Sequence, residues 1–204
     1  MVKAPEKPRA WQRMLSGRRL DLIDPSPVDV EIADIAHGLA RVARWNGQTA
    51  GPEIFSVAQH SLLVEFLFAA ARPEATPGER LSALLHDAPE YVIGDMISPF
   101  KAAVGGDYKR IEERLLAAIR VRFGLPAHAS AALEKAVKTA DRESAFFEAT
   151  GLAGFATTEA RKFFGAPKVA RDLVTSYLSA WRPEEAQRRF LARFRELDST
   201  PGGI

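Results

Sequence analysis

The sequence predicts an all-α fold of about six to eight helices, with room for a short β-hairpin near the N-terminus. Three observations support this class. From about residue 28 onward, apolar residues recur at helical spacing in one segment after another. Ser, Gly and Pro, which are typical of helix starts and ends, separate these segments. With 204 residues, of which 47% are hydrophobic and 26% charged, the chain can bury a sizeable core as one globular domain.

The N-terminal part is expected to differ from the rest of the chain. Residues 1–19 are predicted to form an arm, and 20–204 a single domain. A short alternation at 20–27 ends in a Pro-Ser-Pro turn, which allows a brief strand. Within the domain, the functional core would occupy about 28–150, and 151–204 would add the C-terminal helices.

The helices are expected in the following order. The first covers residues 32–42 and ends at the glycines and the proline of 44–55. Ser56 is predicted to cap the second helix, which continues to Ala71. Pro89 kinks or ends the third. The third, fourth and fifth are expected at 81–88, 107–123 and 130–150. One or two more helices, interrupted near Gly165–Pro167, complete the chain.

Composition and charge exclude several kinds of protein. The absence of cysteine excludes disulfides, zinc-thiolate sites and thiol catalysis. The net charge of +2 is small, and the weak basic clusters near both ends are interpreted as solvated faces rather than a nucleic-acid surface. No apolar run approaches the roughly 20 residues that span a bilayer, and the basic N-terminus has no apolar segment of a secretion signal. We therefore expect a cytoplasmic protein that binds neither membranes nor nucleic acids.

Four polar residues occupy inward positions on three of the predicted helices. His60 lies on the second, His86 and Asp87 end the third, and Asp141 lies on the fifth. An unpaired buried carboxylate is costly, and one cation would compensate all four side chains together. Imidazole nitrogens and carboxylate oxygens are ligands that divalent cations accept in a protein without cysteine. The sequence therefore predicts a site for one divalent ion, and its donors do not choose among Mn, Co, Fe, Zn and Mg.

The order His60, then His86-Asp87, then Asp141 resembles that of the HD-domain phosphohydrolases, over about residues 28–150. The fragments SVAQHS, ALLHDAPEYVIGD and KTADRE most resemble small bacterial and phage enzymes that hydrolyse deoxynucleotides. The resemblance implies an HD-type helical bundle with metal ligands at these four positions. It implies attack of a metal-activated water on the phosphorus of a deoxynucleoside mono- or triphosphate, and a homodimer.

The resemblance also assigns catalytic roles to two further carboxylates. Glu90 matches the residue that orients or deprotonates the attacking water, and Asp95 matches a second acidic residue near it. Glu90 follows His86 by four positions, which places both on one side if the helix continues. Pro89 stands between them, where it is harmless if it opens a new helix.

Four residues are expected to contact the substrate. Arg44 and Trp45 resemble an Arg-Trp pair that lines the pocket of the family, and Lys101 and Lys138 match basic residues that face phosphates. Phosphoryl transfer independently needs positive charge around the equatorial oxygens. The three positively charged side chains, Arg44, Lys101 and Lys138, around one metal ion slightly favour a triphosphate over a monophosphate. On composition alone, Trp45 fits core packing better than base stacking.

Two alternatives remain open. A guanosine tetraphosphate or cyclic-nucleotide hydrolase would use the same ligands. A non-catalytic nucleotide-binding module would usually have lost a ligand or the catalytic acid, whereas the chain has all of them. His37 is expected to be structural. His128 alone is too little for a second metal site.

Overall fold

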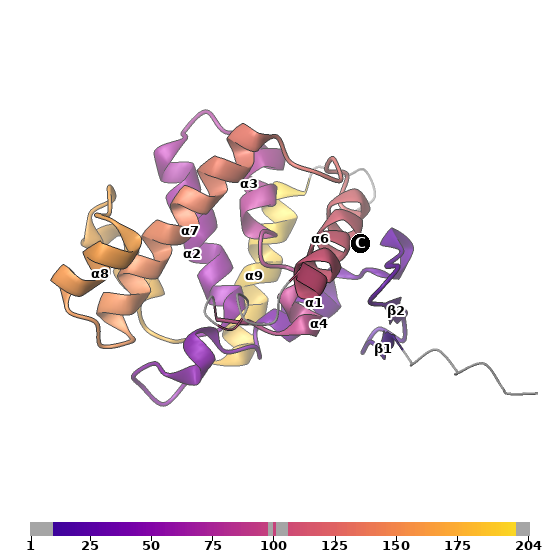
Figure 1. The fold of residues 1–204 in the computed structure, drawn as a ribbon, viewed down its shortest axis with the longest axis horizontal. Helices are drawn as coiled ribbons and strands as arrows, with labels where there is room; N and C mark the ends of the chain where they lie inside the picture. The colour runs from indigo at the N-terminus through magenta and orange to yellow at the C-terminus, as the bar shows by residue number, and fades with distance from the viewer. Residues whose placement is uncertain (1–9, 98–99, 101–105, 199–204) are drawn as a thin grey trace, which may run out of the picture.

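The computed structural model describes residues 10–97, 100 and 106–198, so the predicted substrate residue Lys101 lies outside the described residues. The all-α class is confirmed, and a two-stranded hairpin is the sheet present in the described part (Figure 1). The elements in chain order are β1 (Trp11–Arg13), β2 (Arg19–Asp21), η1 (Pro27–Asp29), α1 (Ile32–Leu39), η2 (Arg44–Gly47), α2 (Val57–Ala71), α3 (Pro77–Leu84), α4 (Glu90–Ile93), α6 (Gly106–Arg122), α7 (Ala131–Gly151), α8 (Thr157–Phe164), η3 (Arg171–Tyr177) and α9 (Pro183–Leu197).

The hairpin joins the N-terminal segment to the helical bundle. Its strands are antiparallel, with Trp11 opposite Asp21. The boundary expected between residues 19 and 20 falls inside β2. The Ser16 hydroxyl donates to the Asp34 carboxylate of α1 at 2.5 Å, which attaches the hairpin to the first helix.

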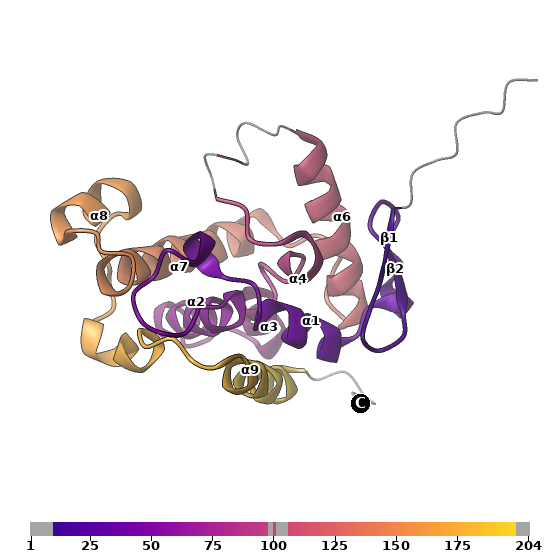
Figure 2. The same ribbon diagram turned by 90° about the horizontal axis from the view of Figure 1, so that it is seen from below.

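Helix α2 is the centre of the bundle. Figure 2 shows α2 between α7 and α9, and α3 also packs on it. The sequence predicts one inward face for this helix, but α2 is buried on almost every side, because three helices surround it. Its buried polar residues include Gln59, His60 and Glu65. A polar residue on any side of α2 must therefore find a partner inside the protein.

The apolar core has two parts, and α2 contributes to both. Val57, Ala58 and Leu62 pack with residues of α1, α3, α4, α6 and α9. Leu67 and Phe68 pack with residues of α7, α8 and η3. The two parts of the core meet along α2, so this helix packs against the apolar residues of both.

A buried carboxylate connects three of these helices. Glu65 of α2 is 3% exposed and accepts a hydrogen bond from Arg80 of α3 at 2.7 Å. Arg193 of α9 donates to both of its carboxylate oxygens at 2.9 Å. Burial of the Glu65 charge is compensated by these two guanidinium groups, which fixes α3 and α9 on α2.

Several helix ends follow the predicted signals. The hydroxyls of Ser56 and Ser130 accept hydrogen bonds from backbone N–H groups in the first turns of α2 and α7, as expected for N-caps. The first helix ends at Leu39, earlier than the predicted residue 42.

Among the described residues, no helix combines the length and apolar character needed to cross a membrane.

Candidate metal centre

His86 and Asp87 lie in a turn rather than at the end of a helix. The prediction that α3 continues to residue 88 is wrong, because α3 ends at Leu84. Pro89 has no backbone N–H, so it cannot donate the helical hydrogen bond to the carbonyl of Leu85. The chain instead makes short turns, such as the bond from the N–H of Ala88 to that carbonyl at 3.0 Å. In this turn, two adjacent side chains can point to the same place.

The four predicted ligands converge on one point. The ligand atoms of His60, His86 and Asp141 all lie within 4.8 Å of one another, and these residues form a group that could hold a metal ion. The Nε2 atom of His60 lies 3.3 Å from Nε2 of His86 and 3.4 Å from Oδ1 of Asp141. The Oδ2 atom of Asp87 is 3.3 Å from the first imidazole nitrogen and 3.2 Å from the second. Two nitrogen and two oxygen donors thus meet at one place.

Both imidazole rings are oriented through their other nitrogen. Nδ1 of His60 contacts the carboxylate of Glu148 at 2.6 Å, and Nδ1 of His86 lies 2.9 Å from the carbonyl of Ala83. When Nδ1–H donates in this way, the neutral ring keeps Nε2 free as a ligand. Since both Nε2 atoms face the same point, the rings are arranged for coordination.

The charges of the site favour a cation at this point. Burial and the nearby Arg44 lower the pKa of His60, but Glu148, Asp141 and Asp87 outweigh them and hold it well above its usual value. Burial alone would raise the pKa of Glu148, but the positive charges of His60 and Arg44 outweigh burial and lower this pKa to about 2. The pKa values of Asp87 and Asp141 are likewise low despite burial, because the imidazoles lie beside them. The three carboxylates are therefore ionised and attract positive charge.

Glu148 is a buried residue that the sequence analysis did not identify. It is fully buried in α7, and its carboxylate accepts hydrogen bonds from the Ser144 hydroxyl at 2.5 Å and from the Trp45 indole at 2.8 Å. With the contact to His60, three side chains bind this one carboxylate. The spacing of Asp141, Ser144 and Glu148, three and then four residues apart, places them on one face of the helix and was the available signal.

The turn η2 presents Arg44 and Trp45 through a rare backbone conformation. Trp45 (φ 57°, ψ 27°) and Asn46 (φ 50°, ψ 33°) are both left-handed, which is uncommon for residues other than glycine. The conformation costs roughly 1–2 kcal/mol at Trp45 and less at Asn46, since asparagine adopts it more readily. The N–H of Arg44 donates to the carbonyl of Phe55 at 2.8 Å, which helps to hold the turn. Such outliers cluster at functional sites.

Arg44 lies among three carboxylates rather than open to solvent. Its guanidinium is 3.4 Å from Asp95, 3.7 Å from Asp87 and 3.7 Å from Glu148. Burial lowers the pKa of Arg44, but these carboxylates raise it above its usual value. Arg44 therefore connects Asp87, one of the four predicted ligands, with Asp95 and with Glu148, the partner of His60.

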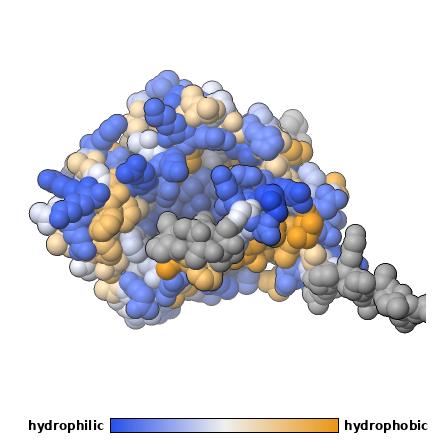
Figure 3. Space-filling view, viewed as in Figure 1, coloured by the Kyte–Doolittle hydropathy of each residue, from blue (hydrophilic) through white to orange (hydrophobic). Residues whose placement is uncertain are grey.

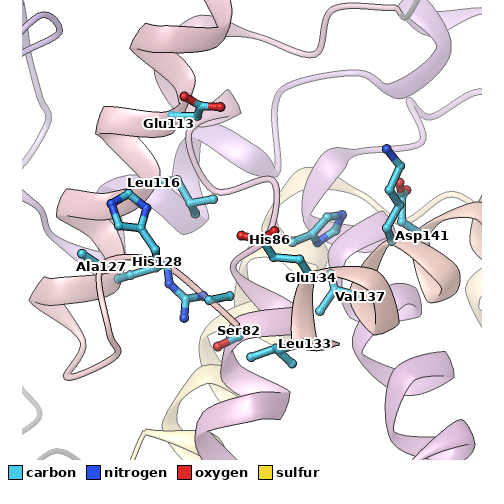
Figure 4. A pocket seen from close by; sticks show the side chains of 13 residues that line it. Ser82, His86, Glu113, Leu116, Ala127, His128, Leu133, Glu134, Val137 and Asp141 are labelled. Carbon is cyan, nitrogen blue, oxygen red and sulfur yellow. The ribbon is translucent and has the colours of Figure 1, made fainter. Parts of the chain in front are cut away.

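Two pockets border the metal centre. The larger has a volume of about 610 Å³ and brings most of the predicted site together. It is lined by Arg44, Trp45, Asp87, Glu90, Asp95, Met96, Ile97, Lys138, Asp141, Arg142, Ala145, Phe155, Phe163 and Phe164. The smaller, of about 560 Å³, shares Lys138 and Asp141 with it. Figure 4 shows His86 and Asp141 on one side of this smaller pocket, and His128 with Glu113 on the other.

Glu90 opens a new helix at the edge of the larger pocket. Pro89 is the N-cap of α4, so it does not interrupt a continuous helix between His86 and Glu90. The Glu90 N–H donates to the carbonyl of Asp87 at 3.0 Å, and its side chain is 2% exposed. Because the turn is short, Glu90 lines the same pocket as Asp87.

Comparison with known proteins identifies one relative that matches nearly the whole chain and another that matches about half of it. No family model matches it. It is 57% identical over 190 residues to an uncharacterized protein of Rhodobacter capsulatus, across 93% of this chain and 96% of that protein. It is also 38% identical over 99 residues to the uncharacterized protein YfdR of Escherichia coli, across 48% of this chain and 49% of YfdR.

Proposed function

The chain belongs to the family of the Rhodobacter capsulatus protein, and we propose that it is a metal-dependent nucleotide phosphohydrolase of the HD-domain type. Its substrates would be deoxynucleoside mono- or triphosphates. The observation that carries the proposal is the convergence of His60, His86, Asp87 and Asp141 beside a pocket of about 610 Å³, within the usual size range of small-molecule sites.

The donor set fits one divalent cation. Two imidazole nitrogens and two carboxylate oxygens, with both rings oriented from behind, suit Mn, Co, Fe, Zn or Mg. A bound ion would polarise a phosphoryl oxygen and make water more acidic. Asp141 and Asp87 are partly exposed toward the pockets, so a ligand could reach this point from solvent.

Glu90 is the proposed general base. Water attacks phosphorus, the bond from phosphorus to the leaving oxygen breaks, and the Glu90 carboxylate accepts the proton of the water. Glu90 lines the larger pocket together with Asp87 and Asp95. Asp95 forms an ion pair with Arg44, and we propose that this pair orients Asp95 beside the attacking water.

Lys138 is the proposed phosphate-binding cation. It is exposed, lines both pockets and makes no ion pair with other described residues, so its ammonium group is available to phosphate oxygens. Arg44 is already engaged by three carboxylates. We therefore propose that Arg44 mainly positions Asp87 and Asp95, and that Lys138 supplies more of the charge that the transferred group needs.

The test combines metal content with phosphate release. Purified protein with Mn²⁺ or Co²⁺ should release phosphate, pyrophosphate or triphosphate from a panel of deoxynucleotides, and the panel should include guanosine tetraphosphate and cyclic nucleotides. His60→Ala and Asp141→Ala should lose both bound metal and activity. His37→Ala removes a histidine of α1 outside the site and should lose neither.

Retention of full metal content by either site variant would overturn the metal assignment. Metal binding without hydrolysis of any nucleotide would overturn the enzymatic proposal and favour a binding module. Activity confined to guanosine tetraphosphate or cyclic nucleotides would change the substrate class.

A further inference from the structure

Four aromatic rings form one wall of the larger pocket. Trp45, Phe155, Phe163 and Phe164, here called the aromatic wall, all line it. The Trp45 ring lies 5.8 Å from Phe155 and 6.0 Å from Phe164, centroid to centroid. Phe163 lies 6.4 Å from Phe155 and 6.2 Å from Phe164. The three phenylalanines lie beyond residue 150, outside the segment that resembles the HD-domain family.

The aromatic wall is held in place by polar contacts. The Trp45 indole N–H donates to the buried Glu148, which fixes the plane of the ring. The N–H of Phe155 donates to the carbonyl of Ala149 at 3.0 Å, and Arg142 donates to the carbonyl of Phe163 at 3.5 Å. The ring of Trp45 and the backbone at Phe155 and Phe163 are therefore held in place before any ligand binds, which lowers the entropic cost of binding.

Phe163 is the ring that is open to a ligand. Its side chain is 61% exposed, whereas the other rings of the wall are partly buried. A single exposed apolar residue is ordinary, but Phe163 lies in a pocket beside three further rings and next to charged groups. In Figure 3, apolar side chains border the mostly hydrophilic hollow on the side of α8. The pocket thus offers a polar end and an aromatic end to one molecule.

We infer that the aromatic wall binds the planar heterocycle of the substrate, with Phe163 as the stacking residue. The inference rests on the proposed function, since the metal centre would hold the phosphate of the same molecule. Ring faces carry no hydrogen-bonding groups that read a base edge, and every base has a face that can stack. The wall therefore selects a flat ring rather than one particular base, and Phe163 is a specificity-determining residue.

The experiment measures binding by calorimetry to the metal-loaded protein, with 2′-deoxyadenosine and 2-deoxyribose as probes. Only deoxyadenosine carries a base, and neither probe contains a phosphate ester that the protein could cleave. Deoxyadenosine should bind and deoxyribose should not. The other three deoxynucleosides should bind as well. In Phe163→Ala, the Kd for deoxyadenosine should rise roughly 5- to 150-fold, the range expected for one stacked base.

Two further variants control the interpretation. Phe163→Leu keeps an apolar side chain without a ring face and should weaken deoxyadenosine binding nearly as much. Leu173→Ala removes an apolar side chain of similar exposure, 58%, that does not line the pocket, and should change nothing.

Unchanged deoxyadenosine binding in Phe163→Ala would overturn the inference, as would equal binding of deoxyribose or binding of a single base. A change of oligomeric state in Phe163→Ala, with nucleoside binding intact, would instead assign the ring to an interface and also overturn it. Because the probes carry no phosphate, these outcomes are independent of phosphate release, which alone decides the proposed hydrolysis.

Discussion

At the scale of single residues, the buried carboxylate of Glu148 connects the candidate metal centre with the larger pocket. One of its oxygens contacts His60, and the other accepts the hydrogen bond from Trp45. Uncompensated burial of this charge would be costly, and the surrounding donors and Arg44 compensate it. A substitution of Glu148 should therefore change the affinity of the site for a metal ion, although Glu148 is not one of the four predicted ligands.

We expect Glu148→Gln to lower the affinity for Mn²⁺ about 10- to 100-fold, because the ring of His60 loses its charged partner. Competition titration against a chelator measures this change. Glu143→Gln is the matched control, because Glu143 is also a buried carboxylate of α7 but accepts hydrogen bonds from the backbone N–H groups of Lys168 and Val169. Equal losses of affinity in both variants would show a general effect of charge or stability.

Glu90 is the residue on which the proposed mechanism depends most. Glu90→Gln keeps the shape of the side chain and removes the base, so we expect kcat to fall about 10²- to 10⁴-fold with metal content unchanged. Glu113→Gln, an exposed carboxylate on the smaller pocket, should keep its activity. Near wild-type turnover of Glu90→Gln would make Asp95 the candidate base, and Asp95→Asn the next variant to measure.

The sequence could identify the residues of the metal group but not all of their surroundings. His60, His86 and Asp141 are predicted as polar residues at inward positions of the expected helices, and the structure brings them into one group, although His86 lies in a turn. Glu148 also occupies such a position, but a lone glutamate on a helix is usually solvent-exposed, so its burial depends on the packing of α7 on α2. The three partners of Arg44 likewise come from separate segments, which periodicity cannot bring together.

At the scale of elements, periodicity and capping signals predicted most helices, and the errors have local causes. Serine caps marked the starts of α2 and α7. The end of the third helix is predicted too late, because apolar residues continue the helical pattern up to residue 88. The helix ends at Leu84, since Pro89 lacks the N–H that would donate to the carbonyl of Leu85. For α2, the apolar pattern predicts one inward face, whereas the packing of α3, α7 and α9 buries nearly the whole helix.

The contact between α1 and α4 tests whether the position of Glu90 depends on helix packing. A Cβ atom added to Gly38 of α1 would lie 2.8 Å from both the Cβ and the carbonyl oxygen of Tyr91, the residue after Glu90. Because backbone cannot yield as a flexible side chain does, we expect Gly38→Ala to destabilise the protein by about 1–3 kcal/mol. It should also reduce activity by moving α4. Denaturant unfolding and turnover are the measurements.

Gly78→Ala is the control for this substitution. A Cβ atom at Gly78 of α3 would meet Leu125 at 3.5 Å, an ordinary van der Waals distance. This variant should be as stable as the wild type or more stable by about 0.5–1 kcal/mol, since alanine favours helix over glycine. If Gly38→Ala behaved in the same way, α1 and α4 would be able to separate without affecting the site.

At the scale of the whole molecule, the candidate metal centre joins segments that are distant in the chain. His60 comes from α2, His86 and Asp87 from the turn after α3, and Asp141 from α7. The hollow on the face shown in Figure 3 lies between α7 and α6, and hydrophilic side chains line it. These segments cannot be brought together in the unfolded chain without the cost of ordering it. A bound ion would therefore select the folded state.

This coupling leads to an expected effect of metal on thermal stability. An ion that binds only the folded state stabilises it by about 2.7 kcal/mol at a hundred times its Kd. For a domain of this size, such a gain raises Tm by about 5–10 °C. Scanning calorimetry should thus show a higher Tm with Mn²⁺ and a lower one with EDTA. His60→Ala should have the same Tm in both, because it has lost a ligand. Equal Tm values for the wild type in Mn²⁺ and in EDTA would contradict a metal bound to the folded protein, whereas a metal-dependent Tm in His60→Ala would place the ion elsewhere.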